Sequence, residues 1–246
     1  MIPHWWLWPG LFALGATVGS FLVTAAIRSA RGEQVIGGRS HCDSCAAPLG
    51  FRRTVPVVSY VQARGRCADC GARIPGLHLA GEVAGGALFV AVGLLTDPVR
   101  AALLLLLGVL LIAAAATDAV TQRLPNVLTA GAALTCGLLA VLAGTASLLA
   151  GVTAAALSFL ILEGLRRLSR GRRGDPGLGF GDVKLVAALA LWLGALTPWM
   201  VTAAALAGLS AMAVLRPADG RLAFGPAIAV AAISIGYGRE AGLWPT

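Results

Sequence analysis

Residues 101–118 read AALLLLLGVLLIAAAATD, an uncharged apolar run that ends at an aspartate, Asp118. Residues 179–196 read GFGDVKLVAALALWLGAL, so a second aspartate, Asp182, lies where another apolar run begins. A carboxylate at a membrane boundary is energetically costly and usually marks a functional site. Two carboxylates on the same side of a bilayer predict a pair that shares one proton and activates water, which is the chemistry of an aspartic protease.

The composition predicts that the rest of the chain is also membrane-embedded. Hydrophobic residues make up 58% of the 246 residues and charged residues 12%, with a mean hydropathy of +0.83. A soluble domain of this size cannot hide so much apolar surface. The sequence therefore predicts an all-α polytopic membrane protein of about eight transmembrane helices, at residues 5–27, 78–96, 99–117, 126–143, 147–165, 183–196, 198–215 and 224–238. The first run has no preceding basic residue and is interpreted as a retained span rather than a signal peptide.

The basic residues lie on one side of this arrangement. All of the 19 lysines and arginines except Arg100 and Arg239 fall in or beside the loops 28–77, 118–125, 166–182 and 216–223. The positive-inside rule places these loops in the cytoplasm and both termini outside. The net charge of +8 is thus explained by topology and by contact with anionic membrane lipids, and we expect no nucleic-acid partner.

Four cysteines lie in the long polar loop between the first two apolar runs. The loop contains the pairs Cys42 and Cys45, and Cys67 and Cys70, each with CxxC spacing. Two such knuckles can place four thiolates around one tetrahedral Zn²⁺. A closed four-cysteine site leaves no open position for substrate, so the zinc would be structural. A redox or disulfide role and an unligated loop are the alternatives, of which cytosolic disulfides are rare. The fifth cysteine, Cys136, lies within an apolar run and is interpreted as a small buried side chain.

The two aspartates differ in how well structure alone explains them. Asp118 follows an apolar helix, where an acid opposes the helix dipole, and Pro125 then ends the segment before the next helix. Asp182 could serve simply as the N-cap of the following helix. An N-cap role does not explain the preceding glycines, Gly179 and Gly181, which permit close approach of another backbone. Glu82 is a candidate supporting group, and pairing with Arg166 or Arg167 explains Glu163.

Six blocks in this order resemble the type IV prepilin peptidase family of GxGD-type aspartic membrane proteases. The blocks are Gly19-Ser20-Phe21-Leu22, the paired CxxC knuckles, Gly65-Arg66-Cys67, Asp118 through Thr129, Gly179-Phe180-Gly181-Asp182-Val183-Lys184-Leu185, and Phe224-Gly225-Pro226.

The resemblance implies a bifunctional enzyme of the bacterial inner membrane. It implies that Asp118 and Asp182 are catalytic, and that prepilin or pseudopilin precursors lose a short basic leader at the cytoplasmic face. It also implies methylation of the new N-terminus from S-adenosylmethionine, with no residues assigned to that cofactor. The expected domains are a first transmembrane helix at 1–28, a cytoplasmic zinc-binding loop at 29–77, and a transmembrane peptidase domain at 78–246.

The chain departs from the family pattern at two positions. Val23 stands where the family usually has asparagine after Gly-Ser-Phe-Leu, and Asp43 where proline often follows the first cysteine. Both positions lie in the part associated with methyl transfer, so a peptidase without methyltransferase activity is the first alternative. A proton-coupled transporter would use the same carboxylates but needs polar residues deep in several spans, which are sparse here. A non-catalytic assembly protein would explain the cysteines and leave both aspartates unexplained.

Overall fold

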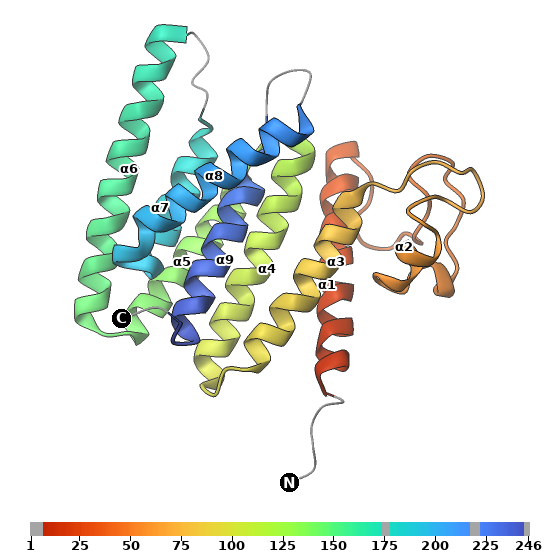
Figure 1. Cartoon of the computed structure of the whole chain (residues 1–246), viewed down its shortest axis with the longest axis horizontal. Helices are drawn as coiled ribbons and strands as arrows, with labels where there is room; N and C mark the ends of the chain where they lie inside the picture. Colours follow the sequence, from red (N-terminus) through yellow and green to blue (C-terminus); the bar gives the residue numbers. More distant parts are fainter. Residues whose placement is uncertain (1–6, 174–177, 217–221, 244–246) are drawn as a thin grey trace. The chain divides into compact units, whose positions relative to one another are not determined.

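The computed structural model of the chain describes residues 7–173, 178–216 and 222–243. Residues 5 and 6 of the first predicted run and both termini, which were expected outside, lie beyond these described residues. The described residues form long α-helices and no β-strand other than isolated bridges (Figure 1). The eight long helices are α1 (Leu7–Arg31), α3 (Gly76–Gly93), α4 (Pro98–Thr121), α5 (Asn126–Leu142), α6 (Thr145–Arg173), α7 (Phe180–Leu193), α8 (Thr197–Leu215) and α9 (Gly225–Glu240).

The predicted all-α fold and the number of eight helical segments are confirmed. Five helical stretches are long and apolar enough to cross a membrane: Leu7–Arg31, Gly76–Gly93, Pro98–Thr121, Thr145–Ser169 and Phe180–Leu215. The last of these joins α7, the short 3-10 helix η3 (Gly194–Leu196) and α8. Several predicted boundaries moved: α1 runs on to Arg31, and α6 runs on to Arg173.

The chain divides into two compact units, Met1–Thr96 and Asp97–Thr246. In the first unit, α1 packs against α3 along facing glycines. A Cβ added to Gly15 would overlap the Gly85 carbonyl, and one added to Gly19 would overlap the Gly81 carbonyl. Small residues therefore allow backbone-to-backbone contact between these two helices, as is common between membrane helices.

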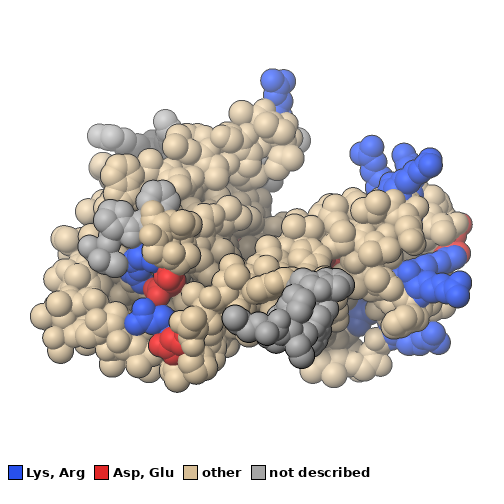
Figure 2. Space-filling view, turned by 60° about the horizontal axis from the view of Figure 1, so that its bottom comes forward, with Lys and Arg blue, Asp and Glu red and all other residues tan. Residues whose placement is uncertain are grey.

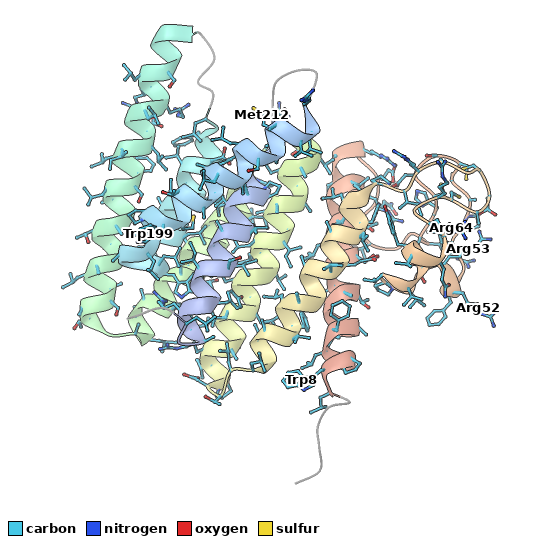
Figure 3. The ribbon with its side chains drawn as sticks, in the orientation of Figure 1. Trp8, Arg52, Arg53, Arg64, Trp199 and Met212 are labelled. Carbon is cyan, nitrogen blue, oxygen red and sulfur yellow. The ribbon has the colours of Figure 1, made fainter. Side chains whose placement is uncertain are left out.

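The polar loop of the first unit connects α1 to α3. It contains the 3-10 helix η2 (Phe51–Arg53) and the short helix α2 (Val58–Gln62). Arg52, Arg53 and Arg64 project from this loop (Figure 3). The space-filling view shows basic side chains gathered on the loop, whereas the surface over the helices is mostly uncharged (Figure 2).

In the second unit, α7 packs against α5 and α6, while α4 packs against α5 and α9. The core is formed by fully buried aliphatic side chains, among them Leu104, Leu107, Leu111, Leu189 and Ile228. The outer helix α6 instead exposes a series of large apolar side chains, including Leu149, Leu157 and Leu160. This distribution suits a helix bundle surrounded by lipid, because exposed apolar surface on this scale is unfavourable in water.

Candidate aspartate site and cysteine cluster

Asp118 lies in the last turn of α4 and is only 5% exposed. Its Oδ2 accepts a hydrogen bond of 2.7 Å from the backbone N–H of Gly225, the first residue of α9. The first N–H groups of a helix have no partner within the helix and carry a partial positive charge. The unfavourable position of Asp118 at the end of α4 is therefore offset by the beginning of α9.

Gly225 is required by this contact. A Cβ added to Gly225 would lie 2.8 Å from Asp118 Oδ2 and 3.0 Å from Asp118 Cβ, closer than normal packing allows. The sequence contains Phe224-Gly225-Pro226 as a recognisable block, but nothing in it reveals that Gly225 contacts Asp118. The proline that follows at the start of α9 fits the first turn, where its missing N–H costs nothing.

Asp182 lies in the first turn of α7, and the N-cap of that helix is Gly179. The interpretation of Asp182 as an N-cap is therefore wrong, because the helix begins two residues earlier, at Phe180. Gly179 and Gly181 both lie in close contacts. A Cβ on Gly179 would lie 2.9 Å from Asp182 Oδ2, and one on Gly181 would lie 2.8 Å from the Cβ of Leu124. Gly179 leaves room for the Asp182 carboxylate, and Gly181 allows the α7 start to approach the chain that follows α4.

Both aspartates line a single cavity of about 340 Å³. Its other lining residues come from the loop after α4 and from the start of α7: Gln122, Arg123, Leu124, Gly179, Phe180, Gly181 and Lys184. Within the described part of the chain, no ion pair involves either aspartate. Among the described residues, the cavity thus holds two carboxylates that form no ion pair, although the cations Arg123 and Lys184 also line it.

The wall of the cavity next to Asp182 is held by contacts of Lys184 and Phe180. Lys184 Nζ donates a hydrogen bond to Oδ1 of Asn126, the first residue of α5. Lys184 Nζ and the Arg166 guanidinium each lie 5.0 Å from the centre of the Phe180 ring. Such cation–π contacts fix the ring of Phe180 in place. The sequence identified Lys184 as a neighbour of Asp182 but gave no sign of this arrangement around Phe180.

The expected pairing of Glu163 with Arg166 or Arg167 is confirmed. It accepts hydrogen bonds from Arg166 Nε at 2.7 Å and from Arg167 Nε at 2.6 Å, both on the same helix face. Cys136 is fully buried in α5, as expected for a small apolar side chain.

The four loop cysteines of the first unit form one cluster. The sulfur atoms of Cys42, Cys45, Cys67 and Cys70 all lie within 4.8 Å of one another. Cys42 Sγ and Cys70 Sγ are 3.9 Å apart, close to the roughly 3.8 Å edge of a tetrahedron with Zn–S distances of 2.3 Å. Backbone N–H groups of Cys45 and Ser44 lower the pKa of the Cys42 thiol to about 7, whereas, against a hydrogen bond from the Ala72 backbone, the neighbouring cysteines raise the pKa of the Cys70 thiol to about 12.

The two CxxC knuckles have the same backbone hydrogen bonds. In each, the first cysteine donates its N–H to a carbonyl five residues later (Cys42 to Ala47, Cys67 to Ala72), and its own carbonyl accepts from the residue four later. That fourth residue is Ala46 in one knuckle and Gly71 in the other, both with positive φ, 57° and 71°. The cluster is therefore built from two copies of one turn, as the CxxC spacing predicts.

Glu82, in α3, is 7% exposed and binds two parts of the first unit. Its carboxylate accepts hydrogen bonds from the Ser20 hydroxyl of α1 at 2.9 Å and from the backbone N–H of Val57 at 2.7 Å. Val57 has a φ of 62°, which a β-branched residue rarely adopts. Glu82 thus connects both helices to the loop that carries the cysteines.

Arg28 is buried at the end of α1 and points toward the same loop. Its Nη2 donates a hydrogen bond of 3.0 Å to the carbonyl oxygen of Arg39. Of the histidines, His41 contacts the Arg39 carbonyl and His78 contacts Asp43 at 3.3 Å. Neither histidine belongs to the cysteine cluster.

Each of the two compact units matches the model of a known protein family. Residues 13–96 match the model of the bacterial peptidase A24 N-terminal domain, and residues 105–215 match that of the type IV leader peptidase family. No solved structure matches the chain.

Three curated relatives carry the name prepilin leader peptidase/N-methyltransferase. The protein from Klebsiella pneumoniae is 37% identical over 193 residues, covering 75% of this chain and 84% of that protein. The one from Bacillus subtilis is 31% identical over 187 residues, covering 75% and 73%. The one from Burkholderia pseudomallei (strain 1026b) is 43% identical over 163 residues, and the aligned part spans 63% of this chain and about half of that protein, 51%. The chain belongs to the type IV leader peptidase family.

Proposed function

We propose that this protein is a prepilin leader peptidase in which Asp118 and Asp182 are the catalytic pair. The observation that carries the proposal is the single cavity lined by both aspartates, with no cation paired to either among the described residues. The names of the relatives from Klebsiella pneumoniae and Bacillus subtilis support a prepilin substrate.

The proposed chemistry is hydrolysis of one peptide bond. Two carboxylates in one cavity resist double ionisation and share a proton. The ionised carboxylate removes a proton from a water molecule, whose oxygen attacks the scissile carbonyl. The protonated carboxylic acid then donates its proton to the leaving amine as the C–N bond breaks. The pair acts as one unit, and we assign neither role to a particular residue.

We propose that the reaction takes place at the cytoplasmic face of the bacterial inner membrane. The support is the concentration of basic residues in the loops on the side of the aspartates. Both termini would then lie outside, the polar loop at 29–77 would lie in the cytoplasm, and residues 78–246 would form the transmembrane peptidase domain. Lipid would surround the exposed apolar face of α6.

We propose a second activity, methylation of the new N-terminal amine. It is supported by the shared name of the relatives, in which N-methyltransferase follows leader peptidase. S-adenosylmethionine would supply the methyl group, and we assign no residue to its binding.

The test is to incubate purified enzyme in detergent with a prepilin from the same organism, with and without S-adenosylmethionine, and to weigh the products. We expect loss of the leader by the wild-type enzyme and intact prepilin with Asp118→Asn or Asp182→Asn. A product heavier by about 14 Da, the mass added when one methyl group replaces a hydrogen, would establish the methyltransferase activity. Intact prepilin with a folded wild-type enzyme would overturn the peptidase proposal.

We further propose that Cys42, Cys45, Cys67 and Cys70 hold a structural Zn²⁺. The donor set fits, since four sulfur atoms converge at a spacing suited to a tetrahedral ion. The bound ion would stabilise the fold of the loop, because structural zinc sites in small domains contribute folding free energy.

Removal of the metal tests this proposal. Elemental analysis of the purified protein should give one zinc per chain, and a Cys67→Ser variant should lose it. A strong chelator should make the loop between α1 and α3 sensitive to protease. The helices should stay intact, since they pack through their own apolar contacts. A chain that contains no zinc yet has a protease-resistant loop would contradict the proposal.

A further inference from the structure

A second cavity of about 560 Å³ lies on the surface of the second unit, among α5, α6 and α7. We call it the alanine groove, because Ala130, Ala133, Ala155, Ala187 and Ala188 line it. Ala130 is exposed and Ala133, Ala155 and Ala187 are half-buried, so the groove is open to the outside of the bundle.

The alanine groove begins where the aspartate cavity ends. Lys184 lines both cavities, and its hydrogen-bond partner Asn126 lines the groove as well. Phe159 of the groove packs edge-on against Phe180 of the aspartate cavity, with ring centres 6.3 Å apart. The two cavities are therefore neighbours that share one wall.

From this shared wall the groove follows the helix axes away from the aspartates. On α7 its lining runs from Lys184 to Leu191, and on α5 from Asn126 to Ala133. Seven residues of α-helix rise about 10 Å, or two turns. The α5 range starts at the first residue of its helix and the α7 range just after the first turn, so the groove leads into the apolar part of the bundle.

The lining of the groove suits an apolar helix. Alanine side chains leave room for a neighbouring backbone to approach closely, and such surfaces are typical of helix contacts in membranes. The polar groups of the groove are confined to the end next to the aspartate cavity. There Lys184 donates a hydrogen bond to Asn126, and the Thr129 hydroxyl donates to the Asn126 carbonyl at 3.0 Å. The deeper part offers no polar partner, so it fits a segment whose backbone hydrogen bonds are internal.

We propose that the alanine groove binds the apolar helical segment that follows the scissile bond of the precursor. This inference rests on the proposed peptidase function. The argument for this occupant is continuity: a chain that lies in the groove with its N-terminal end beside Lys184 has reached a residue that also lines the cavity of Asp118 and Asp182. A lipid chain or a second copy of the protein would need no such connection to the aspartates.

The groove should therefore select precursors that carry an apolar segment. We would compare two substrates: a full prepilin in liposomes, and a short peptide that ends soon after the scissile bond. Filling the groove with Ala133→Phe on α5 or Ala155→Phe on α6 should lower the preference for the full prepilin over the peptide by about tenfold, mainly through KM, because a large side chain in a packed contact is unfavourable. The control is Ala207→Phe, on an exposed position of α8 outside the groove, which should leave the preference unchanged.

A photo-crosslinking amino acid at Ala133 identifies the occupant directly. We expect an adduct with the mass of the precursor when prepilin is present. An adduct only with lipid, or with a second copy of the chain, would overturn the inference, as would an unchanged substrate preference in both groove variants. These failures differ from failure of the proposed function, in which the wild-type enzyme would cleave no prepilin at all.

Discussion

The helices α4, α7 and α9 carry carboxylates near both ends of their bundle, and the surroundings of these carboxylates differ between the two ends. At one end Glu240 is surrounded by donors. Its Oε2 accepts from Arg100 Nη1 at 3.0 Å, and its Oε1 accepts from Arg239 Nη2 at 2.7 Å and from Trp192 Nε1 at 3.1 Å. Arg239 also donates to the carbonyl oxygen of Trp192, at 2.7 Å. Both oxygens of this carboxylate are satisfied by charged or indole donors.

The other end has two carboxylates and no paired cation among the described residues. Asp118 accepts one backbone N–H, from Gly225, and Asp182 lies against the backbone of Gly179. Both residues line a cavity. The difference teaches how to separate structural carboxylates from reactive ones: a buried acid enclosed by cations contributes to the fold, while a buried acid left open is available for chemistry.

The largest expected difference between the two ends is in the rate of cleavage. Asp118→Asn should lower the initial rate by about 10²- to 10⁴-fold, the usual contribution of a general acid or base. Glu240→Gln should leave the rate near that of the wild type, because Glu240 lies at the far ends of α7 and α9. The measurement is prepilin cleavage in detergent at matched enzyme concentration. Equal losses in both variants would remove the distinction between the two ends.

The next effect tests how precisely Asp118 must be placed. Gly225→Ala puts a Cβ within 2.8 Å of Asp118 Oδ2, which should displace the carboxylate and lower cleavage by about 10²-fold, since small misplacements in active sites are costly. The matched control is Gly137→Ala in α5, where an added Cβ meets nothing within 4 Å. Full activity of the Gly225 variant would indicate that the Gly225 contact does not position Asp118.

For thermal stability we expect the opposite order: the substitution at Glu240 should have a larger effect than the one at Asp118. Glu240→Gln weakens the bonds to Arg100 and Arg239 and should lower the free energy of unfolding by about 2 kcal/mol, as for hydrogen bonds to charged groups. Asp118→Asn should leave stability unchanged or raise it, because it removes an uncompensated buried charge. Unfolding in one detergent, followed by circular dichroism, measures both. A more stable Glu240 variant would contradict the structural role of that end.

The smallest expected effect is the loss of stability on removing a single donor to Glu240, Arg100. Arg100 is about one third exposed on its side chain, at 35%, so its pair with Glu240 is partly screened by solvent. Arg100→Gln should cost about 0.5–1 kcal/mol, less than Glu240→Gln, because Arg239 and Trp192 still bind the carboxylate. The cost should shrink in high salt. A salt-independent loss larger than that of Glu240→Gln would mean that Arg100 acts through packing instead.

Much of the fold was predictable because its signals are local. Apolar runs interrupted by charged residues and by Gly or Pro gave all eight helices, with boundaries within a few residues for α4 and α5. The cysteine cluster was equally accessible, since CxxC spacing determines the shape of each knuckle. Pro125 was expected between two helices, and it is the N-cap of α5.

The parts that could not be predicted depend on contacts between distant residues. Gly225 and Asp118 are 107 positions apart, and no pattern in either segment indicates their hydrogen bond. Arg100 and Arg239 were interpreted only as exceptions to a charge rule, whereas both bind Glu240. Asp182 was assigned to the N-cap by one interpretation because helix starts are uncertain by one or two residues from sequence alone.

The bond between Gly225 and Asp118 also has a consequence for protein synthesis. A ribosome that adds roughly 5–20 residues per second takes about 5–20 seconds to pass from residue 118 to residue 225. During that time α4 has been made, but the backbone N–H of Gly225 that donates to the Asp118 carboxylate does not yet exist. A partly synthesised chain therefore lacks the complete site, and the order of translation keeps this membrane protein inert until α9 has been inserted.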